Sequence, residues 1–429
     1  MSNFEISVLF FLQLAFILTI CRAVGWLAKW VGQPQVVAEM IAGVVMGPSL
    51  LGWFWPAGQA WLFPAASTGL LYAVSQVGLV LYMFLVGLEF DTSLIRNRLR
   101  SAAGVSLSGI LVPFVLGCTL GFFLVRSNSF FTAKVVTWEA MFFVGASMSI
   151  TAFPMLARII YERGLSGTSL GTLALAAGSI DDGAAWCVLA LVLASFSSDP
   201  MIAVLAIGGG TLYAIGTLTI GQRLLQPLGK MAEREQGVSP TLLTITLILV
   251  LLGAWFTDRI GIYAVFGAFI MGAAMPRGRF AHEIQRQLEP LTTTFLLPLF
   301  FVYSGLNTRL NLVDSAWLWG IALVVLLAAC LGKGVACWAA ARLSGEDSRT
   351  SLAIGTLMNA RGLMELIILN IGLQRGIITP LLFTVMVIMA IVTTLMASPI
   401  FEWVYRRQAG ATIQAAVLLE QPLKDSLPA

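Results

Sequence analysis

The chain has 429 residues, of which 58% are hydrophobic and 11% are charged, and its mean hydropathy is +0.90. A soluble domain carries about 25% charged residues, so this composition excludes an ordinary soluble protein and indicates an all-α polytopic membrane protein. The formal net charge of +4 comes from basic residues scattered over loops, which argues against nucleic acid as a partner.

Apolar runs divided by charged or Pro/Gly-rich breaks predict about thirteen transmembrane helices. The predicted spans are 5–30, 36–53, 68–88, 102–125, 137–160, 168–196, 201–221, 239–257, 261–275, 290–307, 315–341, 351–373 and 379–404. The first span has no basic region before it and carries Glu5, so we expect a retained helix rather than a cleaved signal peptide. In the second span, Gly43 and Gly47 form a small-xxx-small pattern, which suits close helix packing and is weak evidence for a dimer.

The fifth span, 137–160, contains the stretch SMSITAFPML. Ser149 and Thr151 offer hydroxyl groups, and Pro154 lacks a backbone N–H and clashes with the preceding helical turn. An ordinary kink is the alternative at Pro154 taken alone. Irregular backbone inside a membrane is tolerated where it lines a cavity or is buried in protein, so we expect a broken helix here.

The sixth span, 168–196, carries two adjacent carboxylates, Asp181 and Asp182, in an otherwise apolar run. A charge at the bilayer centre costs roughly 2.5 to 3.5 kcal/mol on insertion scales, so such residues are rare and usually functional. Water at a helix end is the alternative, but apolar residues extend for more than two turns on both sides. Adjacent side chains on a helix point about 100° apart, so the two aspartates cannot have the same task.

Two later spans add polar groups at membrane depth. The eleventh span places Lys333 near its middle between two glycines, where pairing with a buried acid such as Asp181 is favoured over snorkelling. The twelfth span contains MNARGLMEL, which we predict to be the second broken helix, crossing the first. Its polar or helix-breaking residues are Asn359, Arg361, Gly362 and Glu365. Arg361 and Glu365 are also spaced to pair with each other at i,i+4.

The distribution of basic residues predicts the orientation. Seventeen lysines and arginines fall on the side that holds the C-terminus and five on the opposite side. The positive-inside rule then places the N-terminus outside and the C-terminus in the cytoplasm, which requires an odd number of spans. We expect an integral protein of a prokaryotic inner (plasma) membrane.

The chain also repeats itself. LYMFLVGLEFDTSLI, from Leu81, aligns with LFFVYSGLNTRLNLV, from Leu299, and GASMSITAFPMLARIIYERG, from Gly145, aligns with GTLMNARGLMELIILNIGLQRG, from Gly355. Both alignments relate spans seven apart, which enter the bilayer from opposite sides. This predicts inverted-topology repeats, spans 1–6 and 8–13, as in secondary transporters. Chance similarity between apolar, glycine-rich segments is the alternative.

Several motifs together resemble the monovalent cation:proton antiporter-2 family, which includes bacterial Na+/H+ antiporters, potassium efflux proteins and plant cation/H+ exchangers. They are SIDDGAAW, GQPQVVAEMIAGVVMGPSLLG, VGLEFDTSLI, GIYAVFGAFIMG, PLFFVYSGLNTRL and NARGLMELIILNIGL. The resemblance implies that Asp181 pairs with Lys333, that Asp182 binds the ion, and that Thr151 is an ion neighbour. Potassium efflux relatives often carry a cytosolic nucleotide-binding domain, which we do not expect here.

The resemblance also implies a gate and dimer domain against which a core domain moves. The expected segments are 1–100 and 239–312 for the gate and dimer domain, 101–198 and 313–404 for the core domain, 199–238 for a linker span with a basic loop, and 405–429 for a short cytoplasmic tail. We expect a homodimer surrounded by membrane lipid.

We therefore predict a secondary antiporter in which Na+ or K+ and protons compete for the buried aspartates. A cation channel or a potassium efflux protein of the same fold is the alternative. Enzyme activity is not expected, because a membrane aspartic protease needs two acids that converge on one peptide bond, whereas adjacent helical residues diverge. No cofactor is expected.

Overall fold

The computed structural model describes residues 2–31, 33, 35–89, 92–151, 153, 156, 159–160, 165, 168–195, 208–260 and 264–424. Within these ranges the regular elements are helices, and an isolated antiparallel bridge joins Phe131 to Ile378. The all-helical prediction agrees with this architecture.

The helices follow one another with short connections. The first half of the chain contains α1 (Asn3–Trp30), α2 (Gln35–Met46), α3 (Leu51–Phe54), α4 (Pro56–Leu62), α5 (Ala65–Glu89), α6 (Thr92–Leu124), α7 (Thr137–Ser149), α9 (Ser169–Ser195) and α11 (Gly210–Gly216). The second half contains α12 (Gln222–Arg234), α13 (Pro240–Arg259), α14 (Ala264–Ala274), α15 (Arg279–Leu291), α16 (Leu297–Leu306), α17 (Ala316–Cys330), α18 (Ala336–Leu343), α19 (Ser348–Met358), α20 (Leu363–Gln374) and α21 (Pro380–Lys424).

Seven helical segments of the described chain are long and apolar enough to cross a membrane. They are Phe4–Trp30, Val37–Phe54, Ala65–Glu89, Arg100–Ser127, Pro240–Arg259, Ala316–Leu343 and Pro380–Val404. They coincide with the first, second, third, fourth, eighth, eleventh and thirteenth predicted spans. Shorter apolar helices, Ser169–Gly178, Ala264–Ala274 and Glu365–Gln374, lie within the sixth, ninth and twelfth. The count of thirteen stays a prediction.

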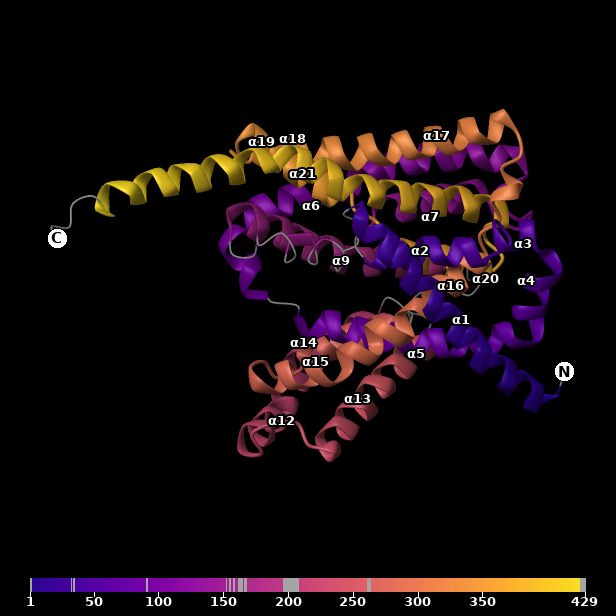
Figure 1. Cartoon of the computed structure of the whole chain (residues 1–429), viewed down its shortest axis with the longest axis horizontal. Coiled ribbons are helices and arrows are strands. Elements are labelled where there is room, and N and C mark those ends of the chain that lie inside the picture. Colours follow the sequence, from indigo (N-terminus) through magenta and orange to yellow (C-terminus); the bar gives the residue numbers. More distant parts are fainter. Residues whose placement is uncertain are drawn as a thin grey trace.

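The most extensive helix contacts fall into two groups. In one group, α5 packs against α14 and α16, α2 packs against α1 and α16, and α13 packs against α14. In the other, α6 packs against α7, α9 and α18, while α17 and α19 pack against α21. Figure 1 shows α6, α7, α17, α18 and α21 along one side of the molecule, and α12 to α15 with α5 along the other.

Two close glycine contacts join α2 to α16. A Cβ atom on Gly43 would lie 2.5 Å from the carbonyl oxygen of Phe301, and one on Gly305 would lie 2.1 Å from the carbonyl carbon of Gly43. A Cβ atom on Gly47 would likewise meet the Gly305 carbonyl oxygen at 2.6 Å. The expectation of close packing at Gly43 and Gly47 is therefore correct, but the partner is a helix of the same chain. The pattern accordingly gives no support for a dimer.

Gly305→Ala is expected to lower the stability of the folded protein, because the added methyl group collides with backbone that cannot rotate away. Overpacking of this kind typically costs about 1 to 3 kcal/mol. Thermal unfolding of the detergent-solubilised variant measures the effect. Gly320→Ala in α17 is the control, since its added Cβ atom meets nothing within 4 Å. Equal melting temperatures for the two variants would contradict the contact.

Candidate ion site

Asp181 of α9 is 1% exposed, and both of its carboxylate oxygens accept hydrogen bonds. Ser106 of α6 donates to Oδ1, and Thr151 Oγ1 donates to Oδ2 at 2.5 Å. Thr151 stands two residues beyond the end of α7, where the backbone has left the helix and Ile150 is extended. Three elements of the chain therefore meet at this one carboxylate.

Lys333 is fully buried and faces the same carboxylate. Its Nζ atom lies 3.2 Å from Asp181 Oδ2 and donates to the backbone carbonyl oxygens of Ser149 and, at 3.0 Å, of Gly109. The structure thus brings together Lys333 and Asp181, as expected from the sequence. Lys333 occupies a π-helical turn, Leu331–Val335, between α17 and α18. Such turns are uncommon and often occur at functional sites.

The chemistry of α6 explains why the Gly109 carbonyl is available to Lys333. In an α-helix this oxygen would accept from the N–H four residues later, but residue 113 is a proline inside α6 and has no N–H. The buried ammonium supplies the missing donor. Because a buried polar group without a partner is costly, Lys333 and Pro113 complement each other.

The C-terminal end of α7 receives both buried cations. The last four carbonyl groups of a helix have no donor within the helix, and they form its partially negative end. Arg361 donates to the Ser147 oxygen at 3.3 Å and to the Met148 oxygen at 2.6 Å, while Lys333 donates to Ser149. The backbone of α7, and not its hydroxyl groups, therefore contacts the two cations.

The segment between α19 and α20 carries Arg361 to this position. After α19 ends at Met358, Gly362 adopts φ +147°, a conformation that a side chain would strain, and α20 begins at Leu363. The Arg361 carbonyl oxygen accepts from Thr394 of α21 at 2.8 Å. Arg361 Nη1 also lies 3.6 Å from Glu365 Oε2, the i,i+4 contact that the spacing allows.

The buried charged groups around the end of α7 balance one another in the part of the chain that the structure describes. They are two cations, Lys333 and Arg361, and two carboxylates, Asp181 and Glu365, each no more than 1% exposed. With both cations charged and both acids ionised, their sum is zero.

Other predicted site residues lie elsewhere or outside the described part. Pro154 and the side chain of Asp182 are not described. The Ser149 hydroxyl donates to the Ala146 carbonyl oxygen of its own helix at 2.9 Å, so Ser149 contributes its carbonyl group to the cation cluster. Asn359 lies away from the Asp181 carboxylate, in the wall of a separate cavity.

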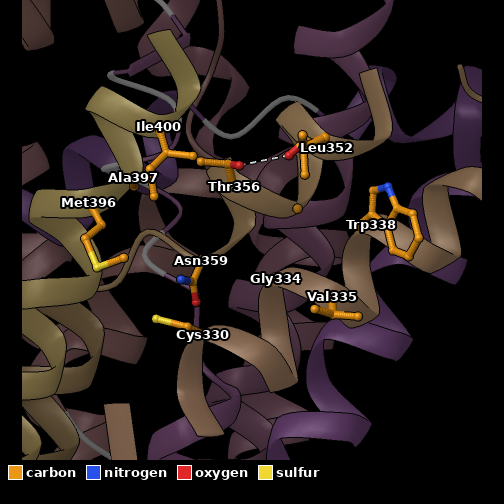
Figure 2. Close-up of a pocket in the computed structure, with 11 residues that line it drawn as sticks. Cys330, Gly334, Val335, Trp338, Leu352, Thr356, Asn359, Met396, Ala397 and Ile400 are labelled. Carbon is orange, nitrogen blue, oxygen red and sulfur yellow. Dashed lines mark hydrogen bonds between the residues drawn. The ribbon is translucent and has the colours of Figure 1, made fainter. Parts of the chain in front are cut away.

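That cavity has a volume of about 360 Å³ and lies between the α17–α18 segment, α19 and α21. Figure 2 shows its lining, in which Asn359 and Thr356 are polar and side chains such as Trp338 and Met396 are apolar. The Thr356 hydroxyl donates to the Leu352 carbonyl oxygen at 2.9 Å. Neither Asp181 nor Lys333 lines this cavity, so it is distinct from the charged cluster.

Sequence reasoning missed two groups of this cluster. Ser106 is one of several small polar residues in the fourth span, and nothing in the sequence selects it. Gly109 carries a usable signal, since a proline four residues later frees its carbonyl group. The sequence does not show which donor fills that position.

Comparisons with known proteins agree on the type of protein. The family model described as sodium/hydrogen exchanger, transmembrane, matches residues 15–407. The Na+/H+ antiporter NhaS4 of Synechocystis is 41% identical over 391 residues, covering 91% of this chain and 95% of that protein. Cation/H+ antiporter 18 of Arabidopsis thaliana is 35% identical over 92% of this chain, which spans 49% of the length of that relative.

A solved structure has a similar fold. The sodium proton antiporter MjNhaP1 from Methanocaldococcus jannaschii superposes with a TM-score of 0.59, covering 91% of this chain and 94% of that chain. At 16% sequence identity, this likeness concerns the fold alone.

Proposed function

Because the chain belongs to the sodium/hydrogen exchanger family, we propose that it is a membrane antiporter that exchanges a monovalent cation, Na+ or K+, for protons. The names of its relatives, a Na+/H+ antiporter and a cation/H+ antiporter, support this activity. The relatives are transporters, in agreement with the expectation that the chain is not an enzyme.

The balance of buried charge carries the assignment of the ion site. The described cluster of Asp181, Glu365, Lys333 and Arg361 sums to zero, so an ionised Asp182 adds one net negative charge. One monovalent cation or one proton neutralises that charge. Binding of one therefore excludes the other, since an unpaired buried charge is costly in either case.

Oxygen ligands for the cation are proposed from the same place. Asp182 supplies a carboxylate, and the Thr151 hydroxyl, which donates its hydrogen to Asp181, keeps its oxygen lone pairs free to face a cation. Oxygen ligands suit a hard cation. Asp181 and Lys333 form the adjacent ion pair, whose separation changes when the cation binds.

Alternating access is proposed to move the core domain, 101–198 and 313–404, against the gate and dimer domain, 1–100 and 239–312, with 199–238 as the linker. The two groups of closely packed helices support this division. The ends of α7 and α19 support two broken, crossing helices within thirteen spans arranged as inverted repeats. A homodimer is proposed by analogy with the family, with 405–429 as a cytoplasmic tail.

Proton movement in proteoliposomes tests the exchange. Addition of Na+, K+ or Li+ outside acid-loaded vesicles is expected to drive protons out of the lumen, in proportion to the affinity of the site for each ion. The two other functions predict different results. A channel would conduct the cation without coupled proton movement, and this result would replace the antiporter with the alternative function.

The proposed orientation places the N-terminus outside and the C-terminus in the cytoplasm of a prokaryotic inner membrane. The seventeen-to-five distribution of basic residues motivates it. A C-terminal reporter that is active only in the cytoplasm should be active, whereas the same reporter at the N-terminus should be silent. Both reporters on one side of the membrane would contradict the odd number of spans and, with it, the inverted repeat.

A further inference from the structure

Glu365 is a buried carboxylate that the proposed exchange does not use. It lies in the first turn of α20 and is 1% exposed. Neither Oε1 nor Oε2 has a hydrogen-bond partner in the described part of the chain. Asp181, by contrast, accepts hydrogen bonds at both oxygens and pairs with Lys333. The two buried acids of the cluster are therefore stabilised very differently as anions.

The cation nearest to Glu365 is directed elsewhere. Arg361 Nη1 and Nη2 donate to the Ser147 and Met148 carbonyl oxygens at the end of α7, and Nη1 is 3.6 Å from Glu365 Oε2. This contact is an electrostatic one, without the paired hydrogen bonds of a bidentate arginine–carboxylate bridge. Lys333 is the second cation that interacts electrostatically with Glu365.

An ionised carboxylate that is buried without hydrogen bonds is costly, and a bound proton removes that cost by making the group neutral. A second alkali cation would need several oxygen ligands and would face the charges of Arg361 and Lys333. A proton needs only the carboxylate itself. We propose that Glu365 is a proton-binding site, separate from the transported protons, whose occupancy controls how well the exchanger binds its cation.

Charge balance gives the direction of this control, which rests on the proposed function of Asp182. With Glu365 ionised, the described cluster is neutral and Asp182 attracts a cation. With Glu365 protonated, Arg361 keeps its charge, so the cluster carries one net positive charge and repels the cation. The site therefore loses affinity as the pH falls, beyond the loss caused by direct competition of protons at Asp182.

Infrared spectroscopy tests the proton site without any transport. The purified protein in detergent is titrated between pH 5 and 9 while the C=O stretch of protonated carboxyl groups is followed. A band that appears on acidification should be present in wild type and in Asp182→Asn and absent in Glu365→Gln. A wild-type protein whose Glu365-dependent band does not appear at any pH in this range would overturn the proposal. Because Asp182→Asn retains the band, failure of the exchange mechanism is distinguishable from failure of this site.

Transport measurements test the control of cation affinity. Glu365→Gln fixes the group in a neutral form of the same size, so its apparent KM for the cation at pH 8 should rise by about tenfold, as expected for loss of one nearby unit charge. Its pH profile should be shallower by one proton. Glu365→Asp, which keeps the carboxyl group, should recover the pH step and also serves if the glutamine variant folds poorly. The exposed Glu235→Gln is the control, and equal KM values for the Glu365→Gln and Glu235→Gln proteins would overturn the proposal.

Discussion

Asp182→Asn is expected to abolish cation-driven proton movement and to leave a folded protein in the membrane. The amide has nearly the size of the carboxyl group and keeps hydrogen-bonding atoms, but it cannot take up or release a proton and carries no charge for the cation. In the charge balance derived above, this substitution removes the single net negative charge. Exchange in proteoliposomes should fall to the level of protein-free vesicles.

The matched control is Asp314→Asn, which makes the same chemical change at an exposed aspartate before α17. Its exchange rate should equal that of the wild type. Size-exclusion profiles and melting temperatures of both variants verify folding. Wild-type exchange by purified Asp182→Asn would show that the cation and proton do not compete for this carboxylate.

Lys333→Gln is expected to remove the voltage dependence of transport, and this result would explain why the chain has two adjacent aspartates. In the proposed cycle, cation binding at Asp182 loosens the Asp181–Lys333 pair and Lys333 releases a proton. Two protons then exchange for one cation, and one net charge crosses the membrane per cycle. Without the ammonium, exchange should become one-for-one and electrically silent.

Imposed potentials measure this difference. For one net charge, a potential of about 60 mV changes the equilibrium ratio of the ions about tenfold, so wild-type flux should respond strongly and that of Lys333→Gln should not. Lys333→Arg is the control for charge, because it keeps the pairing cation but does not release a proton under ordinary conditions. A voltage-independent wild type, or a glutamine variant as voltage-driven as wild type, would contradict this role of Lys333.

The same substitution is expected to lower stability. Removing one partner of a buried ion pair typically costs about 3 to 5 kcal/mol, because the other charge stays buried. Asp181 keeps its hydrogen bonds from Ser106 and Thr151, so the loss should lie at the lower end of that range. Thermal unfolding of Lys333→Gln and of the double variant Lys333→Gln with Asp181→Asn measures it, and the double variant should be the more stable of the two.

The sequence by itself determined the class of protein and the chemistry at its centre. Hydrophobic runs need no tertiary information, because a helix in lipid satisfies its backbone hydrogen bonds within the run, and seven of the predicted spans coincide with long apolar helices. The cost of buried charge likewise selected Asp181 and Lys333, which lie 3.2 Å apart. The Arg361–Glu365 contact followed from i,i+4 spacing alone.

Only the tertiary structure decided which distant groups meet. Gly43 and Gly47 have the same local pattern whether they pack against a second subunit or against α16, and the packing of α2 against α16 settles this choice. Arg361 could have directed its guanidinium group at Glu365, but the end of α7 lies within reach and offers unpaired carbonyl groups. Ser106 joins Asp181 for the same reason. Helical periodicity is a local property, whereas the choice of a hydrogen-bond partner depends on which helix ends and faces the fold brings within about 3 Å.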